Sequence, residues 1–381
     1  MTVKGVTQLL LDLFPGHQVL TDQESLVRYS HDDAEWAPFE TPLAVLLAES
    51  TDDVVRAVRF AGEQGVRIVP RGAGTGLSGG ANSVTECIVV SLERMQAVLE
   101  VNIDERLAVA QAGVLNDNLR AHVAQFGLWY PPDPASSAIS SIGGNVATNA
   151  GGICCVKYGV TRDYVLGLTV VLADASVVTL GRRTAKGVTG YDLTGLLVGS
   201  EGTLGIITEV TVKLLPLAGR EERAVVGYFP SLFSVGTAVA AITAAGIVPA
   251  ALELIDSTCL RAVDEWQGLG LPVGVDSLLL AKVDEPGAAG DRLADRLAEQ
   301  FAAAGGTNVE RAVDAADVDR LFMARRLAYP ALERLGPVLT EDICVPRAAV
   351  PEMLSRIQSS ASVHDVVIAN IAHAGDGNLH P

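Results

Sequence analysis

The sequence has no apolar run long enough to span a lipid bilayer, and basic residues are scarce in it. There are 28 Lys and Arg against 45 Asp and Glu, so the formal net charge is −17. A surface that binds DNA or RNA needs clustered basic residues, so this balance disfavours nucleic acid as a partner. Segment 1–14 carries an acidic residue and has no small-residue cleavage site, which is typical of an amphipathic helix and not of a signal peptide.

Cysteine is also scarce, and no pair has the Cys-x-x-Cys spacing of redox and metal motifs. The five cysteines are at positions 87, 154, 155, 259 and 344. Without a secretory signal, this pattern favours reduced thiols. We expect a cytoplasmic location, with peripheral attachment to a membrane surface as the open alternative.

Glycine, in contrast, is abundant, with 38 residues that concentrate in a few loops. The most glycine-rich loop, residues 70–80, follows a short apolar run at 66–69 that predicts a buried strand. Glycine adopts left-handed backbone angles and lets the backbone approach a ligand closely. Successive N–H groups in such a loop can bind anionic oxygens. The segment therefore predicts a phosphate-binding loop, with a glycine-rich surface turn as the alternative.

Two common phosphate motifs do not fit this loop. Gly74-x-Gly76-x-x-Gly79 matches the dinucleotide fingerprint by letter, but the fingerprint requires a helix that begins at the loop. Residues 79–83 (Gly-Gly-Ala-Asn-Ser) break a helix instead. No Gly-Lys-Ser/Thr ends the motif, so it is not a P-loop. An NAD enzyme with a Rossmann fold is disfavoured on the same ground.

Two further loops have the composition of ligand-binding segments. Residues 131–152 are rich in Pro, Ser, Asn and Gly and carry no charge between Asp133 and Lys157. A long polar but uncharged stretch suggests contact with a buried group, because long loops without a function are uncommon. A wandering surface loop is the alternative. The third loop, residues 197–205, precedes a predicted strand at 206–215.

The pattern of apolar residues predicts a helical arm at 1–37, an α+β unit at 38–217 and a second α+β unit at 218–381. In the second unit we expect helices on one side of an antiparallel sheet. The strands predicted for the first unit are 42–47, 66–69, 87–92, 98–101, 107–112, 165–172, 177–180 and 206–215, and its helices are 51–64 and 114–126. The strands predicted for the second unit are 225–229, 251–255, 277–283 and 363–372, and its helices are 231–245, 291–304, 314–335 and 347–360.

These loops, in this order, resemble those of FAD-linked oxidases and dehydrogenases of the vanillyl-alcohol-oxidase superfamily, which have a PCMH-type FAD-binding domain. The branch with the greatest resemblance is that of the D-lactate, glycolate and D-2-hydroxyglutarate dehydrogenases. The matching segments are 70–80, 132–137, 143–152, 157–159 and 199–205. The resemblance implies an α+β fold with an FAD-binding domain of two α+β subdomains at 38–217 and a substrate or cap domain at 218–381. It also implies dissociable FAD, because residues 70–80 contain no His or Cys for a covalent link. A thioether to Cys154 or Cys155 stays open, against their reading as small buried hydrophobic residues.

The resemblance assigns contacts with FAD to residues of these segments. They are Pro70, Arg71, Gly72, Ala73, Gly74, Thr75, Gly76, Leu77, Ser78, Pro132, Asp133, Pro134, Ser136, Ser137, Gly143, Asn145, Asn149, Gly151, Gly152, Tyr158, Glu201, Gly202, Leu204, Gly205 and Ile206.

The last nine residues, His-Ala-Gly-Asp-Gly-Asn-Leu-His-Pro, place His373 and His380 seven positions apart. Gly375 and Gly377 argue against a helix, whereas a tight turn would bring both imidazoles to one point. Imidazole is the commonest metal ligand, and a polar tail with incidental histidines is the alternative. The resemblance implies that both histidines bind a divalent metal, Zn or Mn.

The family also supplies a Glu ligand and a His base from a segment further downstream. The sequence ends directly after the metal motif. We therefore expect the C-terminal part of the family pattern to be missing, with an incomplete cap and an incomplete metal site.

The resemblance assigns the substrate carboxylate to an arginine in the segment that contains Arg325, and guanidinium suits bidentate carboxylate binding. Arg325 and Arg326 on a solvated helix face is the alternative. Glu341 and Asp342 in an otherwise apolar segment suggest an inward polar role, to which we assign no function.

The predicted function is FAD-dependent oxidation of a D-2-hydroxy acid, with hydride transfer to flavin N5, metal assistance and Arg325 on the carboxylate. The expected partners are the small 2-hydroxy acid, a second copy in a homodimer, and an electron acceptor that is a quinone, a cytochrome or an electron-transfer protein. The alternative is an FAD-binding subunit or remnant without turnover.

Overall fold

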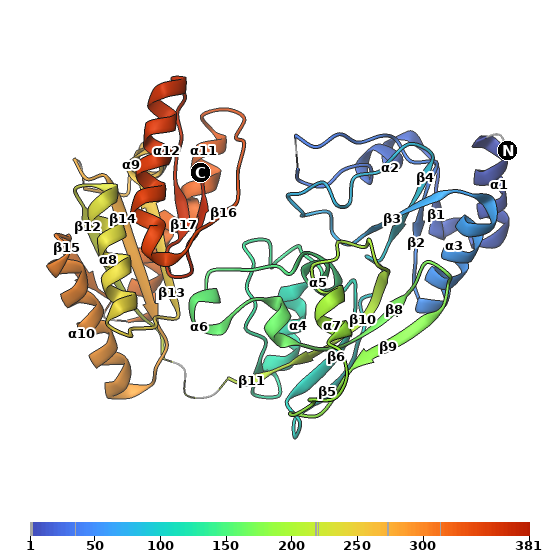
Figure 1. Cartoon of the computed structure of the whole chain (residues 1–381), viewed down its shortest axis with the longest axis horizontal. Coiled ribbons are helices and arrows are strands. Elements are labelled where there is room, and N and C mark those ends of the chain that lie inside the picture. Colours follow the sequence, from blue (N-terminus) through green and yellow to red (C-terminus); the bar gives the residue numbers. More distant parts are fainter. Residues whose placement is uncertain (1–2, 35, 218, 220, 273, 313) are drawn as a thin grey trace. The chain divides into compact units, whose positions relative to one another are not determined.

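The chain forms two compact units in the computed structural model, which describes residues 3–34, 36–217, 219, 221–272, 274–312 and 314–381 (Figure 1). The first unit comprises Met1–Gly151 and Val160–Ala218, and the second comprises Gly152–Gly159 and Gly219–Pro381. The short stretch 152–159 therefore packs with the second unit, although the sequence places it inside the predicted FAD-binding range.

The first unit begins with a four-stranded sheet of order β1-β2-β4-β3, in which β2, β4 and β3 run parallel. The helix predicted at 51–64 is confirmed: Ser50 caps α3 by accepting a hydrogen bond from Asp53 N, and Gly65 ends it at φ +66°. Val6, Leu10 and Phe14 of the N-terminal segment pack into the same core as α3. The elements are α1 (Val3–Leu13), η1 (Gly16–Gln18), β1 (Val19–Leu20), α2 (Gln23–Arg28), β2 (Ala44–Leu47), α3 (Thr51–Gln64), β3 (Arg67–Arg71) and β4 (Cys87–Ser91).

The rest of the first unit is a five-stranded antiparallel sheet of order β5-β6-β10-β8-β9, with a small β11-β7 pair beside it. Two sheets, each with its own helices, match the two α+β subdomains that the sequence predicts. The elements are β5 (Val98–Asn102), β6 (Leu107–Gln111), α4 (Asn116–Ala124), β7 (Leu128–Trp129), α5 (Ile142–Thr148), η2 (Thr161–Tyr164), β8 (Val165–Val171), β9 (Val177–Gly181), α7 (Leu193–Leu197), β10 (Ile206–Lys213) and β11 (Leu215–Pro216).

The second unit contains a seven-stranded antiparallel sheet of order β15-β12-β14-β13-β17-β18-β16. Its central strands β13 and β14 are buried along almost their whole length. The elements are α6 (Cys155–Tyr158), β12 (Arg223–Phe229), α8 (Leu232–Ala244), β13 (Ala251–Asp256), α9 (Ser257–Gln267), β14 (Ser277–Val283), α10 (Gly287–Ala303), β15 (Thr307–Arg311), α11 (Ala315–Glu333), β16 (Ile343–Cys344), η3 (Arg347–Ala349), α12 (Val350–His364), β17 (Ile371–His373) and β18 (Asn378–His380).

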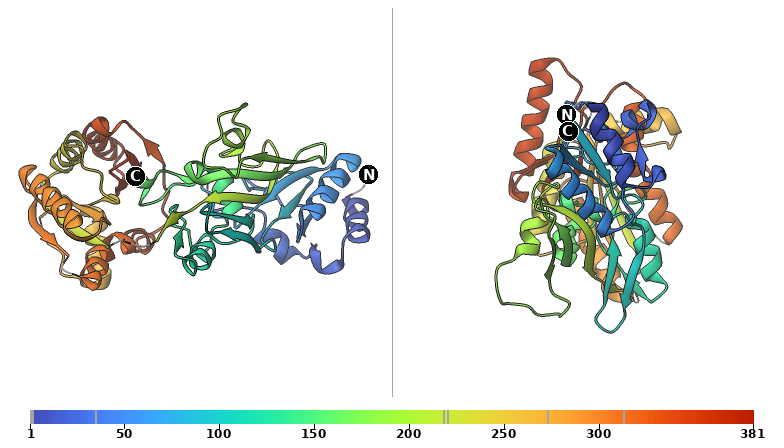
Figure 2. Two further views of the ribbon diagram at one scale, coloured as in Figure 1. Left: turned by 90° about the horizontal axis from the view of Figure 1, so that it is seen from below. Right: turned by 90° about the vertical axis from the view of Figure 1, so that its right-hand side faces the viewer.

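Helices cover both faces of this sheet, so the predicted one-sided arrangement is wrong. Residues of α8, α10 and α12 pack on one face, and residues of α9 and α11 pack on the other, as the views in Figures 1 and 2 show. The cause lies in the central strands, whose side chains are apolar on both faces and need cover on both sides.

The strand predicted at 363–372 is also largely wrong. Helix α12 continues to His364, where Asp365 ends it in the left-handed region at φ +52°. Only Ile371 and Ala372 of that range lie in a strand, β17. The exposed side chains of Val366 and Val367 explain the error, because a β-branched run favours a strand by propensity but here has no partner strand to pack against.

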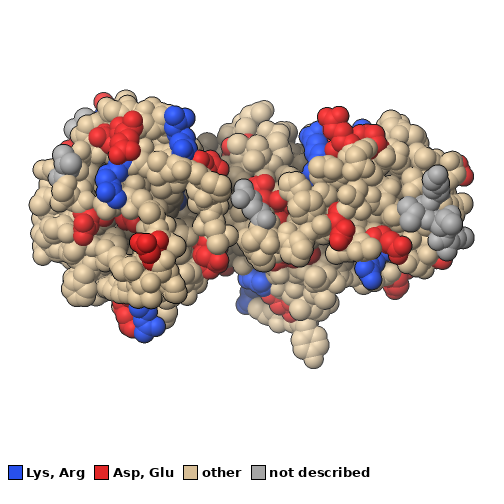
Figure 3. Space-filling model, turned by 90° about the horizontal axis from the view of Figure 1, so that it is seen from above, with Lys and Arg blue, Asp and Glu red and all other residues tan. Residues whose placement is uncertain are grey.

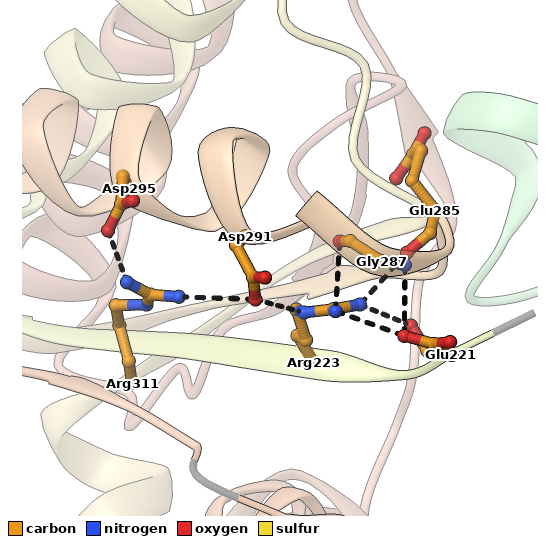
Figure 4. Close-up of polar contacts among 7 residues, drawn as sticks. All are labelled: Glu221, Arg223, Glu285, Gly287, Asp291, Asp295 and Arg311. Atoms are coloured by element: carbon orange, nitrogen blue, oxygen red, sulfur yellow. Dashed lines mark hydrogen bonds and ion pairs between the residues drawn. The ribbon is translucent and has the colours of Figure 1, made fainter. Parts of the chain in front are cut away.

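A network of ion pairs connects the start of β12 to α10 and β15 (Figure 4). Arg223 donates from Nε to Asp291 Oδ1 at 2.7 Å and from its terminal nitrogens to Glu221 and to the carbonyl oxygens of Glu285 and Gly287. Arg311 pairs with Asp291 and Asp295. The guanidinium of Arg223 thus holds the start of β12 against the start of α10.

A second polar contact ties the stretch 152–159 to the sheet of the second unit. The carboxylate of Asp284 accepts from Lys157 Nζ and from the Tyr158 hydroxyl, each at 2.5 Å, and Lys157 also pairs with Glu285. The Asp284 side chain is fully buried. These contacts therefore hold α6 to the C-terminal end of β14.

None of the helices in the described ranges has both the length and the apolarity needed to cross a bilayer. On the face drawn in Figure 3, Lys and Arg lie singly among Asp and Glu and form no continuous basic patch.

Candidate active site

The first glycine-rich loop leaves β3 at Arg71 and runs to β4 without a helix, as the sequence predicts. Gly74 and Gly79 have φ values of +80° and +76°, which glycine adopts without strain. Among the described residues, none accepts a hydrogen bond from a backbone N–H of residues 72–80. The loop therefore presents a row of unused backbone donors, the arrangement that binds anionic oxygens.

The segment before β2 holds this loop in place, which the sequence did not predict. Asp32 Oδ2 accepts from Ala81 N at 3.3 Å, and Asp32 N donates to Asn82 Oδ1 at 2.8 Å. Arg71 is buried and donates to the carbonyl oxygen of His31 at 2.7 Å. Arg71 also packs against Gly74, where any Cβ would overlap its guanidinium. Arg71, which the resemblance assigns to FAD, thus contacts the loop itself and supports its conformation.

The second loop contains the short helix α5, which its glycine and serine content concealed. Ser141 caps this helix by accepting from Gly144 N at 3.2 Å. Gly143 lies against β6, where an added Cβ would be 2.5 Å from Ala112 Cβ. The buried side chains of Ser140 and Asn145 each have a polar atom without a hydrogen-bond partner in the described part of the chain. Such orphaned polar atoms are expected where a polar ligand completes the site.

The three predicted loops contact one another. Gly199 N and Glu201 N of the third loop donate to Val146 O and Ala147 O of α5, at 3.0 and 2.9 Å. Gly202 lies against Pro70 of the first loop so closely that a Cβ would overlap the proline ring. Glu201 itself has φ +48°, a strained value for a residue with a side chain. The first, second and third loops therefore form one continuous surface of the first unit, which we call the loop lining.

The donors and orphaned polar atoms of the loop lining fit the diphosphate and polar groups of FAD. Almost all of the predicted FAD residues lie in the first unit, on or beside these loops. Gly152 and Tyr158 are the exceptions, since they lie in the stretch that packs with the second unit. Cys154 and Cys155 lie there too: Cys154 is buried, and Cys155 Sγ accepts from Gly152 N at 2.9 Å.

The C-terminal motif forms a hairpin of β17 and β18, so the predicted tight turn is present. His373 pairs with Asn378 and Ile371 with His380 in the antiparallel register, and Gly377 turns the chain at φ +87°. The centroids of the His373 and His380 rings are 5.2 Å apart, at an interplanar angle of 84°. The two imidazoles lie together, as expected from the spacing with a turn between them.

A buried carboxylate, Glu253 of β13, lies beside this histidine pair and was not predicted. The register of β13 and β17 sets Glu253 opposite His373, and Glu253 Oε1 is 2.7 Å from His373 Nδ1. Its other oxygen, Oε2, accepts from Arg325 Nε at 2.7 Å. Burial disfavours the charged carboxylate, but His373 and Arg325 outweigh that effect and hold the pKa of Glu253 below its usual value.

The two histidines differ in their electrostatic surroundings. Burial acts to lower the pKa of His373, but the adjacent Glu253 carboxylate outweighs it and raises that pKa. Burial and the neighbouring His373 lower the pKa of His380. His380 therefore favours the neutral form, with a nitrogen lone pair available, whereas His373 keeps a proton on the nitrogen that faces Glu253.

Arg325 is an inward residue, and the solvated-face alternative fits only its neighbour. The Arg325 side chain is 13% exposed and paired with Glu253, whereas that of Arg326 is 50% exposed and paired with Asp319. The predicted inward role of Glu341 and Asp342 is wrong, because both residues are exposed and the side chain of Asp342 is 64% exposed. The buried acid that the site needs is Glu253, from a different strand.

The two predicted metal ligands, His373 and His380, lie together in this arrangement. His373 and His380 supply two nitrogen donors, whereas catalytic zinc usually has three protein ligands. Within the described ranges, no three His, Cys, Asp or Glu side chains lie close enough together to hold a metal ion. The polar cluster of the second unit consists of Arg325, Glu253, His373 and His380.

Two protein families match the chain. Residues 42–181 match "FAD binding domain", and residues 219–381 match "FAD linked oxidases, C-terminal domain". The second match corrects the expectation that the C-terminal part of the family pattern is missing, because that family pattern extends through residue 381.

Individual proteins show the same relationship. The chain is 39% identical to the glycolate oxidase subunit GlcD of Bacillus subtilis, over 89% of this chain and 72% of that protein. It is 34% identical to a D-lactate dehydrogenase of Anaerostipes hadrus, over 95% of this chain and 78% of that protein. The fold superimposes on p-cresol methylhydroxylase with a TM-score of 0.79 at 15% identity, covering 99% of this chain and 82% of that one.

Proposed function

The chain belongs to the family of FAD-linked oxidases and dehydrogenases and is an FAD-dependent hydroxyacid oxidoreductase, and on that premise we propose that it oxidises a D-2-hydroxy acid of the D-lactate, glycolate or D-2-hydroxyglutarate class. Such a substrate carries a carboxylate, an adjacent hydroxyl and a hydrogen on Cα. The proposal therefore requires a flavin pocket, a receptor for the carboxylate and polar groups for the hydroxyl.

The backbone N–H groups of residues 72–80 would hold the FAD diphosphate. They need no lysine, because the row of amides itself supplies the positive end of the dipoles. Asn145 and Ser140 would bond to other polar groups of the cofactor through their unpaired buried atoms. The chemistry that bound FAD supplies is acceptance of the Cα hydride at flavin N5.

Arg325 would bind the substrate carboxylate, and this residue carries the proposal. Glu253 occupies its Nε, and no described residue bonds to its terminal nitrogens Nη1 and Nη2. These two parallel donors match the two oxygens of a carboxylate. The Arg325 side chain is only 13% exposed, and the low polarity of such surroundings strengthens a hydrogen bond to the guanidinium.

His373 and His380 would face the hydroxyl of the same substrate. Their imidazoles are the remaining polar groups of the cluster, and the lowered pKa of His380 keeps it able to accept a hydrogen bond from the hydroxyl. No step of the proposed reaction is assigned to a metal ion. The proposed electron acceptor is a quinone, a cytochrome or an electron-transfer protein, for which a dye substitutes in the assay.

The test is anaerobic mixing of the FAD-loaded protein with D-lactate, L-lactate, glycolate and D-2-hydroxyglutarate, with the visible absorbance of the flavin as readout. We expect at least one of the acids other than L-lactate to bleach the flavin, and L-lactate to leave it unchanged. Bound FAD that none of the acids bleaches would contradict the proposal and favour a flavin-binding subunit without turnover.

Arg325→Lys tests the carboxylate assignment. Lys presents one ammonium in place of the fork, so KM is expected to rise about 10- to 100-fold, the equivalent of about 1.5–3 kcal/mol of charge-assisted hydrogen bonding. Arg326→Lys is the matched control, since the Arg326 side chain is half exposed and, among the described residues, pairs only with Asp319. An equal change in KM for both variants would exclude Arg325 from this role.

A further inference from the structure

Glu253 lies within a strand where an acid is costly. All six residues of β13, Ala251–Asp256, are buried, and Glu253 itself is 0% exposed. A buried carboxylate without partners costs several kcal/mol, so both of its oxygens require donors. The structure gives each oxygen one donor, Arg325 Nε and His373 Nδ1, both at 2.7 Å.

Both donors belong to residues that the proposed function uses, and each bond constrains one of them. A carboxylate on Nε fixes the plane of the Arg325 guanidinium and leaves the two terminal nitrogens for a ligand. A carboxylate on Nδ1 requires a proton there, so neutral His373 keeps its Nε2 lone pair on the opposite edge of the ring.

We propose that Glu253 is a positioning residue that orients Arg325 and His373 together and so aligns the carboxylate and hydroxyl contacts of the substrate. This inference rests on the proposed function for the roles of the two residues that it orients. The contact itself rests on three segments far apart in the sequence, β13, α11 and β17, which meet at this one side chain.

The substitution Glu253→Gln separates positioning from filling of space. A glutamine has the same shape, but its amide has one accepting oxygen and one donating nitrogen. If the oxygen keeps Arg325, the amide nitrogen faces His373 Nδ1, which must then become the acceptor. The proton of neutral His373 moves to Nε2, and the lone pair that faced the substrate is lost.

The first measurement is the tautomer of His373 in the FAD-loaded protein, from the ¹⁵N shifts of its imidazole at a pH high enough that the ring is neutral, assigned with a His373→Gln sample. We expect Nδ1–H in the wild type and in Glu253→Asp, which keeps the charge, and Nε2–H in Glu253→Gln. An Nε2–H tautomer in the wild type overturns the proposal without any variant having to fold.

The second measurement is the division between KM and kcat. Loss of an outer partner of a functional residue typically costs about 10- to 100-fold, and we expect Glu253→Gln to raise KM and lower kcat within that range. Glu253→Asp is expected to recover a measurable part of both. Unchanged KM and kcat in Glu253→Gln would show that Glu253 fills space only.

Asp256→Asn is the matched control, because Asp256 is a buried carboxylate of the same strand. It accepts from Thr258 N, Cys259 N and the backbone and side chain of Asn370, and from neither Arg325 nor His373. We expect this variant to lower the midpoint of thermal unfolding while the His373 tautomer stays Nδ1–H. A tautomer change in this control would overturn the assignment to Glu253.

The two proposals fail in different ways. If no 2-hydroxy acid reduces the flavin of the wild type, the proposed function fails, and the tautomer still tests the contact between Glu253 and His373. If the wild type turns over and Glu253→Gln matches it in KM, kcat and tautomer, the positioning role alone fails.

Discussion

The substitution Gly202→Ala tests whether the flavin site depends on contact between the first and third loops. Gly202 has φ +76°, and a Cβ on it would overlap Pro70 Cγ and lie 3.3 Å from Pro70 Cδ. The two costs have separate origins. The left-handed backbone angle costs about 1–2 kcal/mol for a residue with a Cβ, in the presence or absence of FAD. The overlap with Pro70 costs about 1–3 kcal/mol, as in other overpacked sites.

We expect the apoprotein to relieve the overlap by a small separation of the two loops. A flavin that contacts both loops requires them together, so this second cost is expected to weaken FAD binding. An energy of about 1–3 kcal/mol corresponds to about a 5- to 150-fold increase in Kd. The backbone cost is instead expected to lower the free energy of unfolding of the apoprotein.

Gly65→Ala is the control for the backbone cost. Gly65 has φ +66° at the end of α3, and nothing lies within 4 Å of its added Cβ. We expect about 1 kcal/mol of lost stability and no change in the Kd of FAD. Kd is measured by titration of the deflavinated protein with FAD, and stability by denaturant unfolding. A Gly202→Ala protein that binds FAD as the wild type does would refute the idea that these two loops grip one cofactor.

Three further perturbations follow from the second unit. Asp284→Asn removes the buried charge that holds Lys157, and we expect the free energy of unfolding to fall by about 2–4 kcal/mol in a denaturant titration; an unchanged value would show that the contact is not formed in solution. In Arg223→Lys, a single ammonium replaces the guanidinium and cannot form all the hydrogen bonds of Arg223 drawn in Figure 4. We expect the free energy of unfolding to fall by about 1–2 kcal/mol, and the decrease to become smaller at high salt because the Asp291 side chain is 55% exposed. Cys344 is the exposed cysteine of the chain. The pKa of its thiol is raised, first by the partial loss of water around the sulfur and then by the charges of two nearby aspartates. Its labelling by a disulfide reagent should therefore exceed that of the buried thiols and keep rising beyond pH 9, since only the thiolate reacts; a rate that levels off below pH 8.5 would contradict the raised pKa.

The parts of the fold that the sequence predicted are those that local chemistry determines. The helix predicted at 51–64 and the neighbouring strands predicted at 165–172 and 177–180 each depend on residues within a few positions of one another. The glycine loops were predicted for the same reason, because a backbone that must approach a ligand or another loop requires glycine locally. Helix α5 was missed because glycine at 143 and 144 disfavours a helix, whereas its packing against Ala112 requires glycine there.

The polar cluster of the second unit was only half predicted. His373 and His380 are close in sequence, and two glycines between them indicated the turn that brings them together. Arg325 was selected by resemblance, and its inward position is a property of α11 that its weakly periodic sequence did not give. Glu341 and Asp342 interrupt an apolar segment, which suggests an inward position, but both residues are exposed.

Glu253 was missed because a single acid in a strand has an ordinary interpretation, an edge or a solvent-facing position. Its partners are 72 and 120 positions away, so only the register of β13 with β17 and the packing of α11 reveal them. One local signal was available: Glu253 and Asp256 both interrupt Ala-Leu-Glu-Leu-Ile-Asp, a run otherwise apolar at every position and long enough for a strand with no solvent-facing side. An acid in a strand with no exposed face must have a buried hydrogen-bond donor.

The free-energy cost of burying Glu253 also indicates why an acid occupies this position. Replacing a buried ion pair by apolar residues of similar size is often neutral or stabilising, whereas removing one partner costs about 3–5 kcal/mol. Stability alone would thus be served as well by an apolar side chain at 253 together with apolar partners on α11 and β17. What an apolar cluster cannot do is fix the plane of a guanidinium and the tautomer of an imidazole at once. The cost of burying Glu253 is therefore best explained by the orientation of Arg325 and His373, whose other nitrogens would bind the 2-hydroxy acid in the proposed function.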